Sequence, residues 1–458
     1  MQVYNRKDDK ATNEEQLYTH HYDFSSLNDK DLSWVFNEGL CSDDEKSDVD
    51  VNRNGDCERL NDLGLTQRKW KKYFILKYDR KKLHVRDYKS TGLFRSVIHS
   101  NGSILAISPP KSIDFNEFSQ TYPIEECKME ELVEGTMINL FYDHDIGQWE
   151  MATKSTIGAR SYFFKEYNND TNNDTNNNDN NNDVSTSSNI SEKNSLQNQN
   201  TFRSLFLDVC QEVKLNFDDL PKKYCYSFVF QHPLNRIVIP FTKKRLYLIS
   251  VFQAHRGHIV KCLNEESVEC RDIFAKTNVE YTKKYELKSY KECLDFQKGF
   301  NDYNTVGLSI WHTKSGARTK LRNHVYESVR KLRGNQPKSE YRFLELLRER
   351  RLNEYVYYYP EKKNEINAYK TKLYAFTNQL YSNYISCYIK HELQLKEFPF
   401  QFRKLMTELH DMYKFVLKPN RLVVNKKIVI DYVNNLHPSV LMYSMNLHLR
   451  VLKRPSKE

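Results

Sequence analysis

The sequence predicts an α+β protein whose first part is built from antiparallel sheets and whose last part is all helical. Up to about residue 323, short apolar runs of strand length alternate with turn signals. Beyond that point the apolar residues recur with the 3.6-residue period of a helix. A chain of 458 residues is long enough for two or three domains, and its 31 tyrosines and 25 phenylalanines can fill sizeable cores.

These patterns divide the chain into expected domains. We expect an acidic N-terminal extension over residues 1–65, a sheet domain over 66–325 and a helical domain over 326–458. Apolar residues between 22 and 36 predict one amphipathic helix in the extension. Residues 168–200 are rich in Asn, Asp, Ser and Thr and cannot bury apolar surface, so we expect a disordered insertion inside the sheet domain.

Strands are expected in pairs through the sheet domain. Asn101-Gly102 stands between the apolar runs 96–98 and 104–107 and predicts a hairpin, because both residues tolerate the positive φ of tight hairpin turns. The other expected strands are 70–76, 83–86, 137–142, 149–153, 225–231, 236–241, 246–252, 305–313 and 317–321. An amphipathic helix is expected over 202–214.

The helical domain is predicted from the spacing of its apolar residues. Tyr369, Leu373 and Phe376 share one face of a long helix expected over 364–395. Shorter helices are expected from residue 341 and over 400–416, 426–436 and 439–452, with Pro438 separating the last two.

Charge and cysteine content restrict the class of protein. The net charge of +10 suits a polyanionic partner, because Lys and Arg concentrate in 66–90 and 314–350. Nine cysteines without a C-x-x-C pair predict reduced thiols. No apolar run approaches the roughly 18 residues that cross a bilayer, so we expect a soluble cytoplasmic protein. The histidine spacing offers no zinc site, and we expect no bound metal.

A series of short motifs runs through the sheet domain in a fixed order. They occupy residues 93–98 (Leu-Phe-Arg-Ser-Val-Ile), 105–109, 134–136 (Glu-Gly-Thr), 152–158, 228–238, 305–308 and 316–322. In order and spacing they resemble the RNA ligases of the tRNA-repair type from T-even bacteriophages, which belong to the lysine-dependent nucleotidyltransferases. The resemblance implies ATP-grasp-like antiparallel sheets for residues 69–325. It places the helical domain where these ligases keep an RNA-specificity domain, and it suggests a viral source.

The resemblance also implies what each motif is for. In this family a lysine amine attacks the α-phosphate of ATP, glutamates on two strands hold the ribose or Mg²⁺, and a basic strand binds phosphates. Here the lysine position is Leu132, and the glutamate positions are Val229 and Val306. No lysyl-adenylate can form at Leu132, and without the carboxylates a magnesium site is weak or absent. We therefore expect a degenerate enzyme with no catalytic residue at these positions.

The remaining family positions still suit anion binding. By the resemblance, the nucleotide-binding residues are Arg95, Glu134, Lys154, Lys320 and Arg322. We expect a divergent RNA ligase-like protein that binds RNA, tRNA-like or otherwise, or a nucleotide through a basic cleft.

Two alternatives remain open. One is an active ATP-dependent RNA ligase or nucleotidyltransferase, with ATP and Mg²⁺ as cofactors, in which a displaced lysine such as Lys128 or Lys154 reaches the site. The other is a structural or partner-binding protein in which Leu132, Val229 and Val306 fill the former pocket. The sequence leaves the oligomeric state open.

Overall fold

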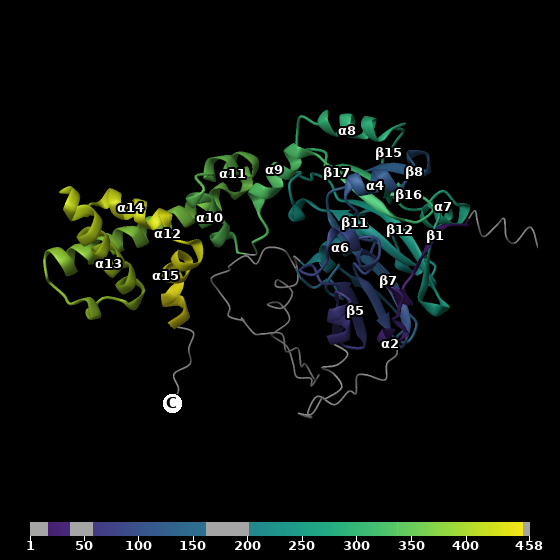
Figure 1. Ribbon diagram of the computed structural model, residues 1–458, viewed down its shortest axis with the longest axis horizontal. Coiled ribbons are helices and arrows are strands. Elements are labelled where there is room, and N and C mark those ends of the chain that lie inside the picture. Colours follow the sequence, from purple (N-terminus) through teal and green to yellow (C-terminus); the bar gives the residue numbers. More distant parts are fainter. Residues whose placement is uncertain (1–16, 37–57, 162–200, 337, 452–458) are drawn as a thin grey trace, which may run out of the picture. The chain divides into compact units, whose positions relative to one another are not determined.

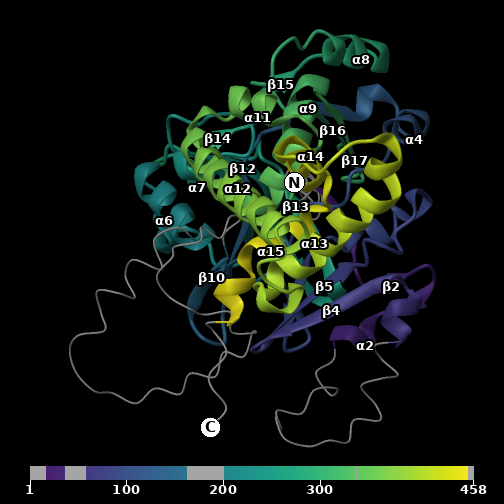
Figure 2. The same cartoon turned by 90° about the vertical axis from the view of Figure 1, so that its left-hand side faces the viewer.

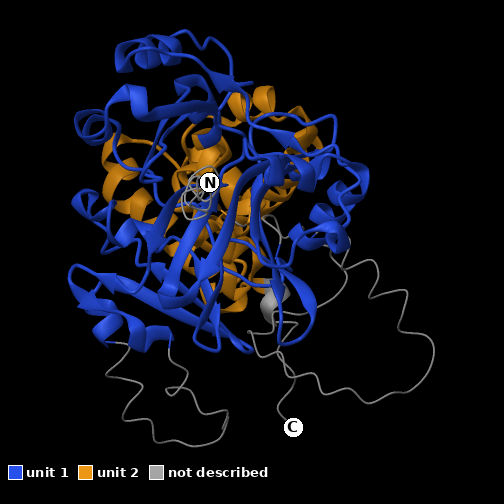
Figure 3. Ribbon diagram, turned by 90° about the vertical axis from the view of Figure 1, so that its right-hand side faces the viewer, with its two compact units in different colours: residues 1–162, 180–330 blue, residues 163–179, 331–458 orange. Residues whose placement is uncertain are grey.

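The computed structural model describes residues 17–36, 58–161, 201–336 and 338–451 (Figure 1). The Asn-rich stretch 168–200, for which we expected disorder, lies outside the described residues. The described residues up to Arg330 form one compact unit and those from Lys331 on form a second, coloured separately in Figure 3. Antiparallel sheets make up most of the first unit and helices make up the second, which confirms the α+β class.

A seven-stranded sheet forms the centre of the first unit. Its strands run in the order β1-β13-β12-β11-β9-β10, and β14 pairs with β12. The bounds are β1 Tyr18–Asp23, β9 Thr136–Asp143, β10 Gln148–Ala152, β11 Cys225–Gln231, β12 Arg245–His255, β13 Ile259–Leu263 and β14 Glu280–Tyr281. All neighbours are antiparallel except β12 and β14.

Two four-stranded antiparallel sheets and a short hairpin complete the strands of this unit. One sheet has the order β4-β5-β6-β7, with bounds Leu65–Trp70, Tyr73–Tyr78, Val97–Ser100 and Ser103–Ile107. The other has the order β15-β8-β16-β17, with bounds Lys284–Tyr285, Cys127–Glu131, Gly307–His312 and Arg318–Arg322. The hairpin consists of β2 Ser26–Leu27 and β3 Lys30–Asp31.

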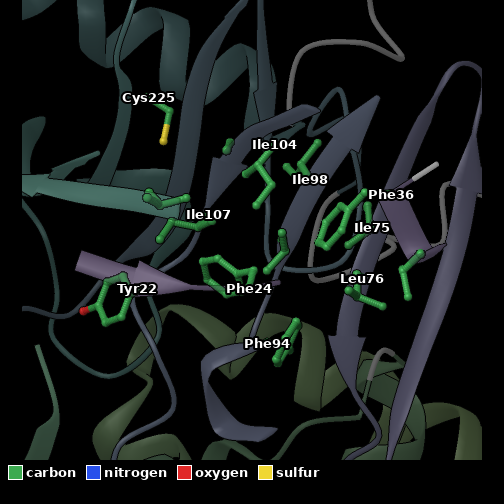
Figure 4. Close-up of a cluster of buried hydrophobic side chains, with 14 of the residues drawn as sticks. Tyr22, Phe24, Phe36, Ile75, Leu76, Phe94, Ile98, Ile104, Ile107 and Cys225 are labelled. Atoms are coloured by element: carbon green, nitrogen blue, oxygen red, sulfur yellow. The ribbon is translucent and has the colours of Figure 1, made fainter. Parts of the chain in front are cut away.

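The faces of these sheets define three apolar clusters. One lies between the β4–β7 sheet and the central sheet, and Figure 4 shows its members Phe24, Phe36, Phe94 and Ile98. A second lies on the other face of the central sheet, against α6 (Phe202–Glu212) and α7 (Val268–Phe274). The third lies between the β8–β16–β17 sheet and α4 (Phe115–Thr121) and α8 (Tyr290–Lys298). Helices α2 (Ser33–Phe36) and α9 (His324–Arg333) also begin in this unit.

The second unit is a helical bundle, seen in Figure 2. Its helices are α10 Ser339–Arg348, α11 Leu352–Tyr358, α12 Lys363–Tyr384, α13 Phe400–Met412, α14 Lys426–Asn435 and α15 Pro438–Val451. The helices expected from the 3.6-residue period are confirmed, although α12 ends sooner than its pattern predicted. Within the described ranges, no helix combines the length and apolar character that crossing a bilayer requires.

Several strand predictions are confirmed, and the hairpin at Asn101-Gly102 is one of them. These two residues have φ of 50° and 69° and join β6 to β7. Strands were also correctly expected at β9, β10, β11, β12, β16 and β17, and a helix at α6.

Three expectations were wrong, each for a physical reason. Residues 22–36 form strands and a short helix, because Tyr22 and Phe24 are buried at a two-residue spacing on either side of exposed Asp23. Residues 83–86 lead into a 3-10 turn, and only Leu83 among them is partly buried, so they lack the alternating buried side chains of a strand. Residues 236–241 form no strand, because the backbone amides of 237–239 bind a buried carboxylate.

Candidate functional site

Strand β17 presents a row of cations on one face. Side chains alternate between the faces of a strand, so Arg318, Lys320 and Arg322 lie on one face and Leu321 on the other. Leu321 packs in the apolar cluster with Leu308. The apolar contacts of one face therefore fix the orientation of the basic face.

Two further segments bring cations toward this row. The Nη1 of Arg95 donates to the Pro109 carbonyl at 3.3 Å, and the Nη2 of Arg318 donates to the same oxygen at 3.2 Å. The Nε of Arg318 donates to the carbonyl of Pro110 at 2.8 Å. The next residue, Lys111, donates its backbone N–H to the Gly92 carbonyl at 2.9 Å, which holds this segment beside the turn before Arg95.

Mutual electrostatic effects show that these groups lie close together. Burial lowers the pKa of Arg95, and the charge of Arg322 lowers it further. Burial and then the charges of Arg95 and Arg80 lower the pKa of Lys154 to about 8. Burial lowers the pKa of Lys320 well below its ordinary value, with Arg318 as the largest charged contributor. We call this set the cation cluster; its members are Arg95, Lys111, Lys154, Arg318, Lys320 and Arg322.

Most of the cation cluster lacks a neutralising anion. Within the described part of the chain, Arg95, Lys111, Lys154 and Lys320 form no ion pair with a carboxylate. Arg322 does form one, with Glu327 at 2.8 Å. A cation that is partly buried without a partner is unfavourable, so the cluster has the electrostatic character of a site for an external anion.

Aromatic rings lie beside two of the lysines. The Nζ of Lys154 donates to the Tyr78 hydroxyl at 3.1 Å and lies 4.7 Å from the centre of its ring. The Nζ of Lys111 lies 3.8 Å from the centre of the Tyr88 ring. These contacts position the ammonium groups without neutralising their charge.

Glu134 has a different environment from the one expected of a nucleotide-binding residue. Its side chain is buried, and Oε1 accepts hydrogen bonds from the backbone N–H groups of Ile237, Val238 and Ile239 at 3.3, 2.9 and 3.1 Å. Burial raises the pKa of the carboxyl, against the effect of these donors. The structure therefore does not bring Glu134 into the cation cluster, and its carboxylate holds the 237–239 backbone in place.

The motif over residues 228–238 has a corresponding structural role. The Nε2 of Gln231 donates to the Glu134 carbonyl at 2.9 Å, and the Nδ2 of Asn235 donates to the Thr136 hydroxyl at 2.8 Å. Together with the amides that bind Glu134, these bonds fix the loop between β8 and β9.

The same loop lies close to Leu132, Val229 and Val306, the aliphatic residues at which the expected ionisable groups are absent. Leu132 donates its backbone N–H to the carbonyl of Gly307 at 2.9 Å, and Gly307 is the residue that follows Val306. Gly135 lies so close to Val229 that a Cβ at Gly135 would come within 2.7 Å of the valine Cγ1. Val229 and Val306 are buried. The structure thus gathers Leu132, Val229 and Val306 around one loop, as the motif order implied.

Lys128 lies in another environment. Its Nζ is 2.7 Å from Oε1 of Glu130 and 3.1 Å from Oε1 of Glu265. Burial opposes the charged form of Lys128, but these two carboxylates raise its pKa above the ordinary value. Lys128 lines a cavity of about 340 Å³ together with Glu265 and Trp311, and no member of the cation cluster lines it. A protonated amine is a poor nucleophile, which disfavours Lys128 as a displaced catalytic lysine.

Two cluster members were missed by sequence reasoning. Arg318 stands two residues before Lys320, and the two-residue period of a strand could have placed it on the same face. Lys111 follows Ser108-Pro109-Pro110, and no local pattern predicts its position. In the described part of the chain, no three His, Cys, Asp or Glu side chains converge in a way that could hold a metal ion.

Comparison with known proteins gives a distant similarity. No protein-family model and no curated protein matches the sequence. Among solved structures, the chain is similar to a putative ATP-dependent DNA ligase from Aquifex aeolicus, with 12% identity over 87% of this chain and 78% of that one, at a TM-score of 0.34. It is also similar to an archaeal ATP-dependent RNA ligase, with 9% identity over 86% of this chain and 78% of that one, at a TM-score of 0.29.

Proposed function

We propose that this chain binds the phosphates of RNA or of a nucleotide through the cation cluster. We also propose that it forms no lysyl-nucleotide at position 132, where Leu132 replaces the expected lysine. The observation that carries the proposal is the set of cations without carboxylate partners, Arg95, Lys111, Lys154 and Lys320. A phosphate among them would supply the missing negative charge and accept charge-assisted hydrogen bonds.

A binding titration tests this proposal directly. Fluorescence anisotropy would follow a labelled single-stranded RNA, and ATP would be added as a competitor, with and without Mg²⁺. We expect binding at low salt that needs no Mg²⁺ and weakens as salt increases. The Lys320→Met variant should bind about tenfold more weakly, because one good charge-assisted contact is worth roughly 1.5–3 kcal/mol.

A matched variant separates the cluster from general surface charge. Lys298 carries the same charge, its side chain is 75% exposed, and its Nζ lies 3.4 Å from Oδ1 of the exposed Asp295. Lys298→Met should bind RNA as the wild type does. Absence of binding at low salt, or equal loss in both variants, would argue against the proposal and favour a structural or partner-binding protein.

A second candidate function is nucleotidyl transfer from a displaced lysine. The lowered pKa of Lys154, about 8, and the lowered pKa of Lys320 favour this candidate, because a neutral amine is the nucleophilic form. In such a step the amine nitrogen forms a bond to the α-phosphorus of ATP, the bond to the β-phosphate oxygen breaks, pyrophosphate leaves and the amine proton passes to solvent.

Radiolabelling distinguishes the two candidates. The chain would be incubated with α-³²P-labelled ATP and Mg²⁺ and then separated on a denaturing gel. We expect no labelled protein band. An acid-labile, alkali-stable band that disappears in Lys154→Met or Lys320→Met would establish the transfer activity instead.

A further inference from the structure

A turn of the helical unit points large apolar side chains outward. Residues 414–427, which we call the basic turn, join α13 to α14 through a π-helical turn ending at Leu417 and a 3-10 turn ending at Asn420. Leu422 donates its N–H to the Leu417 carbonyl at 2.9 Å, and the Asn420 Nδ2 donates to the Val416 carbonyl at 2.7 Å. The backbone of the basic turn is therefore closed by its own hydrogen bonds.

Two apolar residues of the basic turn point inward, and the others are exposed. Leu417 and Val424 are each 7% exposed and anchor the turn to the helical unit. The exposed side chains are Phe415 at 77%, Val416 at 54%, Leu422 at 53% and Val423 at 67%. Single exposed apolar residues are ordinary, but a group of them on one short ordered turn indicates an interaction surface.

The same turn carries a concentrated positive charge. Exposed basic residues alternate with the apolar ones; they are Lys414, Lys418, Arg421, Lys426 and Lys427. The sequence from 414 to 427 contains no Asp or Glu. Asp411 precedes the turn, and its carboxylate is 3.8 Å from the Lys414 Nζ; such an exposed pair neutralises little charge.

We propose that the basic turn docks on an anionic lipid surface. Aliphatic side chains such as Val416, Leu422 and Val423 have no π face on which a nucleic-acid base could stack, so RNA does not account for their exposure. The boundary between lipid headgroups and acyl chains does account for it, because it takes up apolar side chains while the headgroups attract Lys and Arg. This surface lies within the helical unit, and the proposal for it does not depend on the cation cluster.

Vesicle flotation with the full chain tests the proposal. Vesicles of phosphatidylcholine alone would be compared with vesicles that also contain phosphatidylserine. We expect the chain to float with the phosphatidylserine vesicles at low salt, to bind less as salt increases, and to stay unbound with phosphatidylcholine alone. The Phe415→Ser/Leu422→Ser variant should bind about tenfold more weakly or worse, since both apolar anchors are lost.

Matched controls separate docking from general effects of substitution. Tyr357 is 78% exposed in the same unit but lies outside the basic turn, so Tyr357→Ser should float as the wild type does. Lys320→Met should also float normally, which distinguishes this surface from the proposed phosphate site. A Phe415→Trp variant should show a blue shift of its added fluorescence with phosphatidylserine vesicles, a readout that does not depend on a loss of binding.

The proposal fails if phosphatidylserine vesicles do not bind the chain, or if the basic-turn variants float as well as Tyr357→Ser. It also fails if the added tryptophan shows no shift. Weakened RNA binding in Phe415→Ser/Leu422→Ser, with unchanged flotation, would assign the basic turn to nucleic acid instead.

Discussion

At the scale of single residues, Lys320 lies in surroundings that oppose its positive charge. Its ammonium group lies among Arg318, Arg95 and Arg322, and burial together with these charges lowers its pKa well below the ordinary value. Lys320 itself forms no ion pair within the described residues, although the neighbouring Arg322 pairs with Glu327. The lysine therefore costs free energy in the unbound protein, which agrees with the proposed role in phosphate binding.

We predict that Lys320→Met stabilises the unbound chain. Removal of a poorly compensated cation should raise the free energy of unfolding by about 1 kcal/mol, while RNA binding weakens. Urea unfolding of the variant and the wild type measures the change, with exposed Lys298→Met as a control that should differ little from the wild type. A less stable Lys320→Met protein would show that the lysine serves the fold.

The lowered pKa of Lys154 predicts how the stability of the folded chain depends on pH. Its folded pKa is about 8, whereas unfolded lysine titrates near 10.4, so between these values the unfolded chain binds more protons and stability rises with pH. Below pH 8 both states are protonated, and the unfavourable effect of the buried charge is fully present. Lys154→Met should therefore be more stable than the wild type at pH 7, and the gap should narrow as the pH rises from about 8 toward 10. Urea midpoints across this range measure it, and a constant gap would contradict the lowered pKa.

At the scale of structural elements, the loop between β8 and β9 depends on a glycine. Gly135 has φ of 150°, and a Cβ there would lie 2.4 Å from the Phe230 carbonyl oxygen and 2.7 Å from the Val229 Cγ1. Neither the backbone oxygen nor the buried valine can move away without disturbing β11. The close approach explains why the loop requires glycine at position 135 whatever its chemical role.

We predict that Gly135→Ala destabilises the chain by at least about 2 kcal/mol, or prevents folding, because strain in φ adds to overlap with β11. Gly257 is the matched control: its φ is 75°, and nothing lies within 4 Å of a Cβ there. Gly257→Ala should cost only about 1 kcal/mol from backbone strain. Thermal unfolding followed by circular dichroism compares the two, and equal losses would show that overlap with β11 is unimportant.

The elements also show what could be predicted from sequence and why. Strands at β6, β7 and β11 and the helices of the second unit follow from local turn chemistry and periodicity. The expected strand over 236–241 failed because its amides bind Glu134, a residue about a hundred positions earlier in the chain. The expectation that Glu134 binds a nucleotide came from its motif, and the motif does not reveal that these three backbone donors reach its carboxylate.

The cation cluster, too, was predicted from sequence only in part. Arg95, Lys154, Lys320 and Arg322 were expected together, and the structure brings them together, because the sheets around them follow from local patterns. Lys111 reaches the cluster through a long-range backbone bond to Gly92, which no single stretch of sequence encodes. Cluster residues that fall within the quoted motifs were therefore predictable, whereas Lys111, which a backbone contact with another segment positions, was not.

At the scale of the whole molecule, attraction of an outside anion depends more on where the positive charges lie than on the net charge of +10. Many exposed lysines lie beside carboxylates, such as Lys284 beside Glu266 at 2.6 Å and Lys314 beside Glu126 at 2.5 Å. Such pairs contribute little to attraction for an outside anion. The cation cluster and the basic turn are positive regions with few such pairs. They should therefore attract a polyanion more strongly than the paired lysines do.

This distribution predicts a specific salt dependence for RNA binding. Each phosphate contacted by a cation releases counterions, and the logarithm of the binding constant falls with the logarithm of salt by about 0.7 per contact on a single strand. If Lys320 contacts a phosphate, Lys320→Met should bind with a slope shallower by about 0.7 and with weaker affinity at every salt concentration, whereas Lys298→Met should keep the wild-type slope. Anisotropy titrations at several salt concentrations measure the three slopes. Equal slopes in Lys320→Met and the wild type would mean that Lys320 contacts no phosphate, and a shallower slope in Lys298→Met would mean that the RNA responds to overall charge and not to the cluster.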